Sequence, residues 1–321
     1  MDLNLNDTLD NVSKTLSMPA YSEGPANMRE NLSSVVTKLN KRVTPIRDRL
    51  PRVTWSGLAA AWNVLTTIWS GATPTAEWAK PTQSASTYVK RHALYKQFGS
   101  TKGITDMMIN AGKSFQNQEA AELEIAMLEL LRDEETFIVT WDINVSALQY
   151  DWLKKTIVTN VIDDNNNALG YRPDLLNQAI EIQLSTYDAR ATAIYNGYGM
   201  QRAINDSFTG NVQVNIDSTN SVSSGITVWT FSSVAWVLPF VTSPAVKWDA
   251  VTYPWFTVES MYVVVENSDG TDVLYIEELQ GMVKQYIGRV WTWIEFMVYH
   301  QNVLVNRAEE YHVEIQNVRV K

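Results

Sequence analysis

Three histidines are the residues of this chain whose side chains most readily bind metals or transfer protons. His92, His300 and His312 fall on separate predicted strands, and none belongs to an HExxH motif or has carboxylates at metal-ligand spacing. The chain has no cysteine and no GxSxG motif, so it offers no thiolate ligand and no marked nucleophile. The sequence therefore predicts surface or interface histidines, no catalytic or metal site, and no cofactor.

A glycine-containing turn is the first of two weak ligand motifs. Gly197 and Gly199 lie between a predicted strand and a predicted helix, which is where a dinucleotide-binding loop would lie. Arg202 stands at the third glycine position, and no strand–helix repeat precedes the turn. We interpret the segment as a plain connection from strand to helix.

The second weak motif resembles a calcium loop. Asp163, Asn165, Asn167 and Asp174 fall at the first, third, fifth and twelfth positions of such a loop. Ala168 occupies the position that needs glycine, and an aspartate is a poor substitute for the bidentate glutamate at the end. A polar turn is the better interpretation.

Composition limits the classes of partner. The 321-residue chain has a formal net charge of −9, and 45% of its residues are apolar. This content indicates a globular chain, and the acidic balance argues against a protein that wraps nucleic acid with a basic surface. We expect any contact with DNA to be loose. With no apolar run of membrane-spanning length and no export signal, the sequence predicts a soluble protein with no membrane partner.

Twelve tryptophans could provide stacking surfaces for sugars or bases. They are scattered through predicted strands without a cluster of carboxylates and amides, and this distribution favours packing in the core and between subunits. A carbohydrate-binding β protein is retained as the alternative from another functional class.

The most regular element that could position these residues is a long helix, "QNQEAAELEIAMLELLRDEETFI", over residues 116–138. Apolar residues recur at steps of three and four, and 23 helical residues span roughly 34 Å. The pattern predicts an apolar core face and an acidic solvated face, formed respectively by Leu123, Met127, Leu130 and Leu131, and by Glu122, Glu129 and Asp133.

The chain before this helix reads as an arm followed by a loop. Residues 1–50 are polar and rich in turn formers, so we expect an arm that needs another surface to hold it. The Trp-rich stretch 55–69 fits one helical face and also suits a strand, and the sequence leaves both readings open. Proline, serine and threonine then predict an exposed loop tip around Lys80 and Pro81, before a returning strand at "TYVKRHALYKQF".

After the long helix, "RPDLLNQAIEIQLSTY" predicts an amphipathic helix, "ARATAIYN" a strand and "GMQRAINDSF" a second helix. From residue 211 the chain reads mostly as sheet. Asp269 and Gly270 predict a tight turn within "SMYVVVENSDGTDVLYIEE", which we interpret as a hairpin.

The order of these elements resembles the tailed-bacteriophage major capsid proteins of the Hong Kong 97-like type. "AEWAKPTQSASTY" looks like the extended-loop tip of that family, and "FGSTKGITDMM" with "AAELEIAMLELLRDEETFI" looks like its peripheral strand and spine helix. "YRPDLLNQAIEIQLSTYDARATAIYNGYGMQRAIND" is similar to its axial helix, core strand and following helix, and "FMVYHQNVLVNRAEEYHVEIQNVRV" resembles its C-terminal strands.

The resemblance implies an α+β fold divided in a particular order. It implies an N-terminal arm (1–50), a Trp-rich segment with an extended β-hairpin loop (51–98), a peripheral domain with the spine helix (99–165), an axial domain (166–285) and return strands of the peripheral domain (286–321). Glu77, Lys80 and Pro81 would then form the loop tip. Some members of the family cross-link a loop lysine to another subunit, but a single lysine does not predict that chemistry here.

The implied function is structural and not enzymatic: self-assembly into the icosahedral shell around the double-stranded DNA of a tailed virus. The implied partners are other copies of the chain in hexameric and pentameric capsomers, a scaffolding protein, a portal and, optionally, a decoration protein. The protein would be part of the virion after assembly in the host cytoplasm. The shell of an encapsulin nanocompartment, which has the same fold, is the close alternative.

Overall fold

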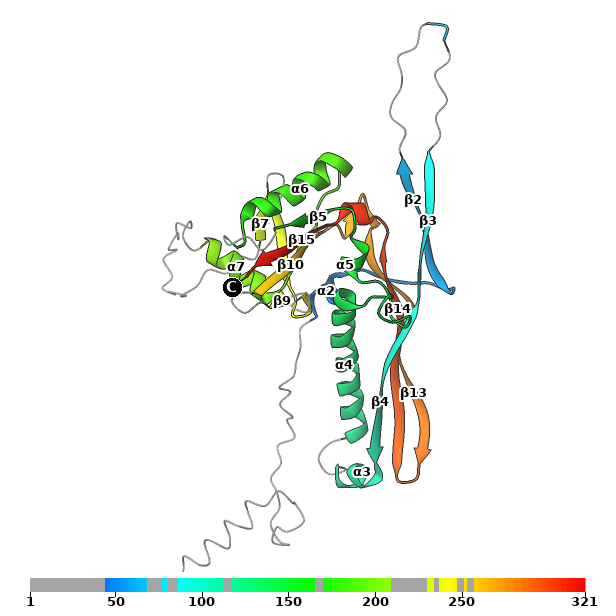
Figure 1. Ribbon diagram of the computed structural model, residues 1–321. Coiled ribbons are helices and arrows are strands. Elements are labelled where there is room, and N and C mark those ends of the chain that lie inside the picture. The colour runs from blue at the N-terminus through cyan, green and yellow to red at the C-terminus, as the bar shows by residue number, and fades with distance from the viewer. Residues whose placement is uncertain are drawn as a thin grey trace, which may run out of the picture.

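The computed structural model describes residues 44–67, 77–79, 86–112, 117–164, 170–208, 230–233, 237–246, 251–252 and 257–320. In Figure 1 a long helix and long strands run together toward one end, a strand pair projects at the other end, and a second group of strands and helices lies to one side. The described residues contain two larger sheets, which we call the long sheet and the wide sheet.

The long sheet has the described strand order β1-β13-β14-β4. Its strands are Arg52–Thr54 (β1), Leu274–Val290 (β13), Trp293–Asn306 (β14) and Lys96–Thr105 (β4). β13 and β14 form a long antiparallel hairpin, β4 pairs with the outer edge of β14, and β1 joins β13 in parallel. This sheet supports the long helix.

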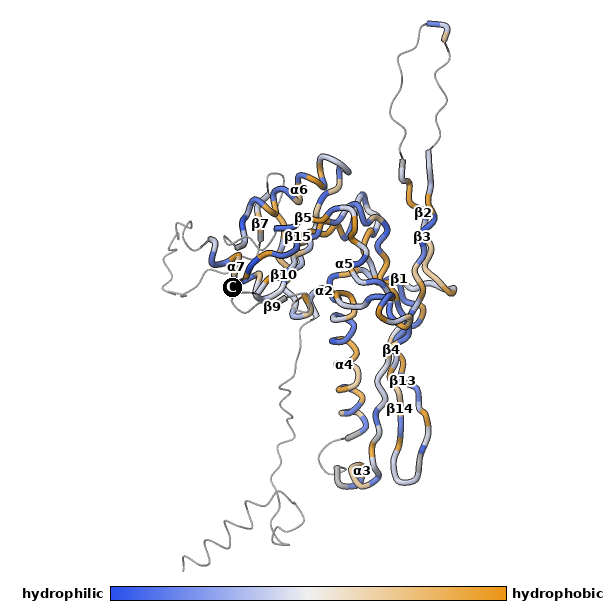
Figure 2. The backbone as a smooth tube through the Cα atoms, in the orientation of Figure 1, coloured by the Kyte–Doolittle hydropathy of each residue, from blue (hydrophilic) through white to orange (hydrophobic). Residues whose placement is uncertain are grey.

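The long helix α4 spans Gln118–Thr140 and packs along β4 and β14. Asn117 Oδ1 accepts hydrogen bonds from the backbone N–H groups of Glu119 and Ala120 at 3.1 and 3.3 Å, which satisfies two amides that have no partner within the helix. A short helix, α3 (Asp106–Gly112), connects β4 toward it. The predicted long helix is therefore confirmed, and the alternating colours along α4 in Figure 2 show its amphipathic character.

The wide sheet follows the order β5-β15-β10-β6-β8-β7, with β9 also paired to β10. Its strands are Val161–Asp163 (β5), Val313–Arg319 (β15), Thr257–Val264 (β10), Ala193–Asn196 (β6), Val237–Thr242 (β8), Thr230–Ser232 (β7) and Val251–Thr252 (β9). Helices α6 (Pro173–Tyr187) and α7 (Tyr198–Phe208) pack against it. The predicted helix, strand and helix between residues 172 and 208 are confirmed.

Smaller elements connect these layers. They are the helices α2 (Pro45–Arg49) and α5 (Leu153–Thr156), the 3-10 helix η3 (Glu309–Tyr311), and the strands β2 (Ala59–Thr67), β3 (Thr87–Leu94), β11 (Asn267–Ser268) and β12 (Thr271–Asp272). Residues 59–67 of the Trp-rich stretch form a strand, which decides between the helix and the strand that the sequence left open.

The predicted turn at Asp269 and Gly270 is present between β11 and β12, and both residues have positive φ, 51° and 77°. The longer hairpin predicted around it is wrong, because β10 on one side belongs to the wide sheet and β13 on the other belongs to the long sheet. The segment is thus the crossing between the two sheets.

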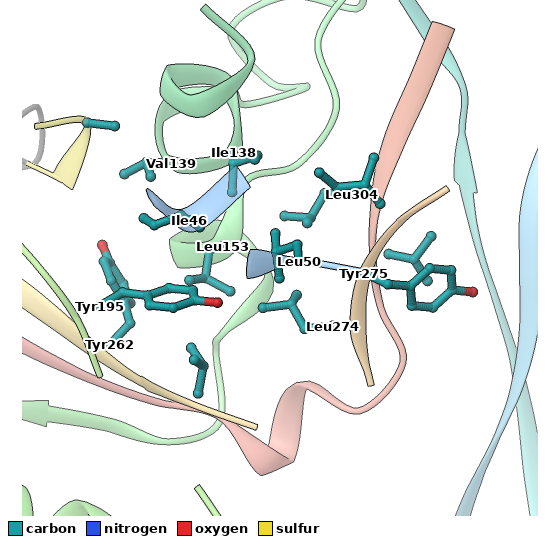
Figure 3. Close-up of a cluster of buried hydrophobic side chains, with 14 of the residues drawn as sticks. Ile46, Leu50, Ile138, Val139, Leu153, Tyr195, Tyr262, Leu274, Tyr275 and Leu304 are labelled. Carbon is teal, nitrogen blue, oxygen red and sulfur yellow. The ribbon is translucent and has the colours of Figure 1, made fainter. Parts of the chain in front are cut away.

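The largest buried cluster lies where the two sheets meet. Figure 3 shows Ile46 and Leu50 at its centre, between side chains of α4, of the wide sheet and of the long sheet. Ile46 is 1% exposed and Leu50 is 4% exposed. The prediction that residues 1–50 form an arm outside the core is therefore wrong for residues 44–50, and residues 1–43 lie outside the described part.

Two of the predicted domain boundaries are wrong. The boundary between residues 285 and 286 falls inside β13, and β15 pairs with β10 of the wide sheet instead of returning to the long sheet. β5, placed in the peripheral domain by the sequence, also belongs to the wide sheet. A period of two identifies a strand but carries no information about which distant strand it pairs with.

Candidate assembly surface

A pair of strands projects from the molecule and exposes apolar side chains. β2 and β3 pair antiparallel with Leu65 opposite Tyr88, and Figure 1 shows the pair extending away from both larger sheets. Tyr88 is 67% exposed, and Leu65 and Val89 are exposed as well. A two-stranded hairpin is marginally stable alone in water. The exposed apolar side chains on this pair favour its burial against another protein surface. The pair has the features of a docking element.

The base of this strand pair is anchored to the body by polar contacts. Trp62 Nε1 donates a hydrogen bond to the carbonyl oxygen of Arg307 at 3.2 Å, and Arg91 Nη2 pairs with Glu310 Oε1 at 2.9 Å. A cleft of about 530 Å³, with Trp62 and Tyr150 in its lining, separates the base from α5 and β14. The anchored base sets the direction in which the pair projects.

The opposite end of the molecule also exposes apolar side chains. Trp291 at the β13–β14 turn is 91% exposed, Tyr286 near the end of β13 is exposed as well, and Met107 of α3 is 82% exposed. Asp106 and Arg289 form an ion pair that joins α3 to the hairpin. Large apolar groups at both ends of an elongated chain favour contacts with other proteins.

Only part of the predicted core face of α4 is buried. Leu130 is buried, Leu123 is half-buried against the same cluster, and Leu131 is partly exposed. Met127 is 39% exposed, so its predicted place in the core of this chain is wrong. The helix buries Ala126 and Leu130 against the long sheet, and Ile138 and Val139 further along it belong to the cluster between the two sheets.

The predicted acidic face of α4 is also divided. Glu122 and Asp133 are partly exposed, and Asp133 pairs with Arg132 at 3.0 Å. Glu129 instead points toward β4, where its carboxylate lies 2.8 Å from Lys102 Nζ and accepts a hydrogen bond from Ser100 at 3.3 Å. The prediction that Glu129 lies opposite the sheet is therefore wrong.

Two neighbouring glutamates of α4 that the sequence analysis missed are buried. Glu134 is 0% exposed and contacts Arg47, Arg52 Nη2 at 2.9 Å and Asn302 Nδ2 at 2.5 Å. Burying an unpaired carboxylate is costly, and these donors offset the cost of burying Glu134. The basic stretch "PIRDRLPR" was the available signal, but alone it does not identify its acidic partner.

The second buried glutamate, Glu135, accepts hydrogen bonds from the backbone N–H groups of Ile46 and Arg47 at 3.2 and 2.7 Å. Ser243, which follows β8, donates its hydroxyl to the same carboxylate at 2.5 Å. Burial raises the pKa of Glu135, and these three donors lower it in part.

The three histidines have different surroundings. His92 is exposed on β3, whereas His300 and His312 are buried, so the surface or interface prediction is wrong for the latter two. His300 Nε2 lies 3.3 Å from Glu278 Oε1, and this contact, together with Arg52, holds the pKa of Glu278 at about 2. Among the residues that the structure describes, no group of three potential ligands could hold a metal ion.

His312 is a neutral structural residue that joins three segments. Its Nδ1 accepts a hydrogen bond from the N–H of Val265 at 3.2 Å, and its Nε2 lies 3.0 Å from Asn306 Oδ1. This arrangement requires the proton on Nε2. Complete burial lowers the pKa of His312 to about 3.

The two weak ligand motifs contain no assembled site in the described residues. The Glu259 carboxylate accepts a hydrogen bond from the N–H of Met200 at 2.8 Å and would overlap with a Cβ at Gly199, so the start of α7 already holds an anion of its own. Asp163 accepts a hydrogen bond from Asn317 at 2.9 Å, and Asp174 lies in the first turn of α6. Asn165, Asn167 and Ala168 lie outside the described residues.

At the predicted loop tip, Glu77 is exposed in a turn, and Lys80 and Pro81 lie outside the described residues. None of the helices in the described ranges has the length and apolar character needed to cross a membrane.

No family model matches the chain, and no curated protein sequence does. Solved structures do match its fold. The SrpI encapsulin of Synechococcus elongatus superposes with a TM-score of 0.66 at 10% identity, covering 91% of this chain and 94% of that chain. The chain has the Hong Kong 97-like capsid fold.

Two further matches show how widely this fold is shared. Gordonia phage Cozz matches with a TM-score of 0.64 at 12% identity, covering 94% of this chain and 97% of that chain. The capsid of the native GTA particle matches with a TM-score of 0.62 at 12% identity, over 94% and 99% of the two chains. The α+β fold predicted from the order of elements is confirmed.

Proposed function

We propose that this chain is a shell-forming protein, and specifically the major capsid protein of a tailed virus. The observation that supports the proposal is a capsid fold that covers more than 90% of the chain, combined with exposed apolar groups on the β2–β3 pair and around Trp291. A fold that leaves large apolar groups uncovered at both ends has a physical reason to assemble with copies of itself. The function is structural and not enzymatic.

The proposed partners follow from this function. Other copies of the chain would form hexameric and pentameric capsomers, assembled in the host cytoplasm with a scaffolding protein and a portal, with a decoration protein as an optional addition. Packaged double-stranded DNA would be contacted weakly, because the chain carries a net charge of −9. The mature location would be the virion.

An encapsulin shell is the second candidate, and the match to the SrpI encapsulin supports it. The two candidates differ in what the shell encloses. Purified particles from the native source would hold nuclease-protected double-stranded DNA if the chain is a viral capsid protein, and a packaged protein if it is an encapsulin.

The experiment that tests the shared shell function is electron microscopy and sedimentation of the purified chain, with and without a co-expressed scaffolding protein. We expect capsomers or closed shells. A strictly monomeric profile across salt and pH conditions, with the scaffold present, would count against both candidates.

The extended loop is the most specific part of the proposal. We propose that Glu77, Lys80 and Pro81 form a tip that packs on a neighbouring subunit, because the described strands β2 and β3 lead toward it and expose apolar side chains. Denaturing gel electrophoresis of particles tests whether chains are covalently cross-linked: ladders would show cross-linking, and we expect single bands because one lysine near the tip does not predict that chemistry.

A further inference from the structure

Residues 44–54, which we call the strap, pass through the junction between the two sheets. The strap contains α2 and β1, and it follows directly on residues 1–43 of the sequence. Its apolar side chains Ile46 and Leu50 pack at the centre of the cluster in Figure 3, beside Tyr195 and Tyr262 of the wide sheet and Leu274 of the long sheet. One short segment therefore fills the space that both sheets share.

Three arginines of the strap contact carboxylates on three different elements. Arg47 pairs with Glu134 of α4, and Arg49 Nε pairs with Glu266 Oε1 at 2.5 Å, just beyond β10. Arg52 pairs with Glu134 at 2.9 Å and also with Glu278 of β13. Arginine suits this arrangement because its planar group presents several donors to more than one acceptor.

Further contacts tie the strap to the wide sheet. Arg49 Nη2 donates to the carbonyl oxygen of Thr192 at 3.2 Å, and Tyr195 donates its hydroxyl to Glu266 Oε1 at 2.6 Å. The Glu135 carboxylate accepts from two strap amides and from Ser243 after β8. The strap thus contacts α4, the long sheet and the wide sheet at once.

These contacts depend on one another. Glu134 is fully buried, and lifting the strap would remove Arg47 and Arg52 from it together. Releasing only part of the strap would leave Glu134 buried without one of its arginines, which is costly. Release of the whole strap lets water reach the carboxylate, so it is favoured over partial release. The strap should behave as one cooperative unit.

We propose that the strap opens and closes as a unit, without unfolding of the whole chain, and that its closed state fixes the relative orientation of the long and wide sheets. This inference concerns the single chain and does not depend on shell formation.

Thiol labelling tests the first half of the proposal, because the chain contains no cysteine and any introduced thiol is the only reporter. Ile46→Cys places the thiol in the strap, and Ile204→Cys places it in α7, where the native side chain is 0% exposed. We expect Ile46→Cys to react at least about tenfold faster than Ile204→Cys, since strap opening needs less free energy than global unfolding.

Arg49→Gln should raise the labelling rate of Ile46→Cys by about tenfold, as expected for the loss of a hydrogen bond to a charged group. The rate for Ile204→Cys should rise by about the same factor, because the contacts of Arg49 are lost in global unfolding as well, so Ile46→Cys should stay the faster-labelled site. Arg202→Gln is the matched control, because Arg202 pairs with Asp206 on the exposed surface of α7 and should change neither rate.

Equal labelling rates for the two cysteines in all variants would overturn the proposal, because the strap would then open only with the whole chain. If Ile46→Cys does not fold, hydrogen exchange in the cysteine-free chain gives the same comparison. The amides of Ile46 and Arg47, both bonded to Glu135, should then exchange faster than that of Ile204, and faster still in Arg49→Gln.

Spin labels test the second half. Asp174→Cys in α6 and Gln285→Cys in β13 are both exposed and lie on the wide-sheet and long-sheet sides. In doubly labelled chains diluted with unlabelled protein, Arg49→Gln should broaden the distance distribution, and Arg202→Gln should leave it unchanged. An unchanged distribution in Arg49→Gln, despite faster labelling at residue 46, would refute the role of the strap in orientation.

Discussion

Acid should destabilise the folded chain through His312, in a pH range where few other groups titrate. Burial lowers the pKa of His312 to about 3 from the ordinary value of 6.5. The folded chain therefore keeps this histidine neutral, while the unfolded chain takes up a proton as the pH falls below 6.5. The stability that depends on the neutral form is complete above pH 6.5 and is lost progressively as the pH falls toward 3.

The size of the effect follows from the difference between the two pKa values. At pH 5 the solution is 1.5 units below 6.5 and still well above 3, so the loss is about 2 kcal/mol at 1.36 kcal/mol per unit. The steepest slope is about 1.4 kcal/mol per pH unit. The interval between pH 7 and pH 5 lies above the ordinary pKa of carboxylates, so most of the change in stability measured there comes from histidine.

Urea unfolding of the unassembled chain, followed by tryptophan fluorescence at pH 7 and pH 5, measures the effect. His312→Gln retains a donor toward Asn306 but leaves the N–H of Val265 without its acceptor, so it should cost about 1–3 kcal/mol at pH 7. At pH 5 this cost should shrink by about 2 kcal/mol, because the variant has no histidine to protonate there.

His92→Gln is the matched control, since His92 is exposed on β3. This variant should lose as much stability between pH 7 and pH 5 as the natural chain does. The reasoning fails if His312→Gln loses the same amount over that interval, because the acid sensitivity would then come from other groups.

Four other variants test the assembly surfaces and the faces of α4. Replacing residues 73–86 by a short Gly-Ser linker should leave the thermal melt cooperative but abolish shells in electron micrographs, because a lost contact is repeated at every symmetric interface. The formation of normal shells would contradict this prediction. Leu130→Asp should lower the free energy of unfolding by about 3–5 kcal/mol in urea, because it buries an unpaired charge. Met127→Asp, at an exposed position, should lower it by less than about 1 kcal/mol, and equal losses would show that the helix faces are assigned wrongly. Trp291→Ser should change the unfolding free energy by less than about 0.5 kcal/mol yet weaken assembly in sedimentation, and unchanged assembly would exclude this end as an interface.

Local patterns were sufficient to predict several elements of this fold. The three- and four-residue steps of Leu123, Leu130 and their neighbours predict α4, and Asp269 with Gly270 predicts a turn that is present. The pairing between strands that are distant in the sequence could not be predicted from local patterns. β13 and β15 have similar alternating patterns but belong to different sheets. β13 pairs with β1 and β14, whereas β15 pairs with β10 and β5, and both β1 and β5 lie more than 100 residues earlier in the chain.

The acidic residues of α4 show the same limit within one helix. Glu129, Glu134 and Glu135 are chemically alike, and helical spacing alone predicts that acidic residues face water. Their actual positions depend on Lys102 of β4 and on the strap arginines, which approach from other parts of the chain. A charge is tolerated in the interior where donors meet it, so the pattern of one element cannot locate a buried ion pair.

The strap also bears on the proposed relation of the chain to DNA. Read as sequence, "KRVTPIRDRLPR" is a basic patch in an acidic chain and a natural candidate for phosphate contacts. In the fold, Arg47, Arg49 and Arg52 all pair with glutamates of the same chain. The positive charge of Arg47, Arg49 and Arg52 is therefore used to hold the two sheets together. A shell built from such subunits would confine DNA without binding it through these three arginines, which agrees with the weak contact proposed from the net charge.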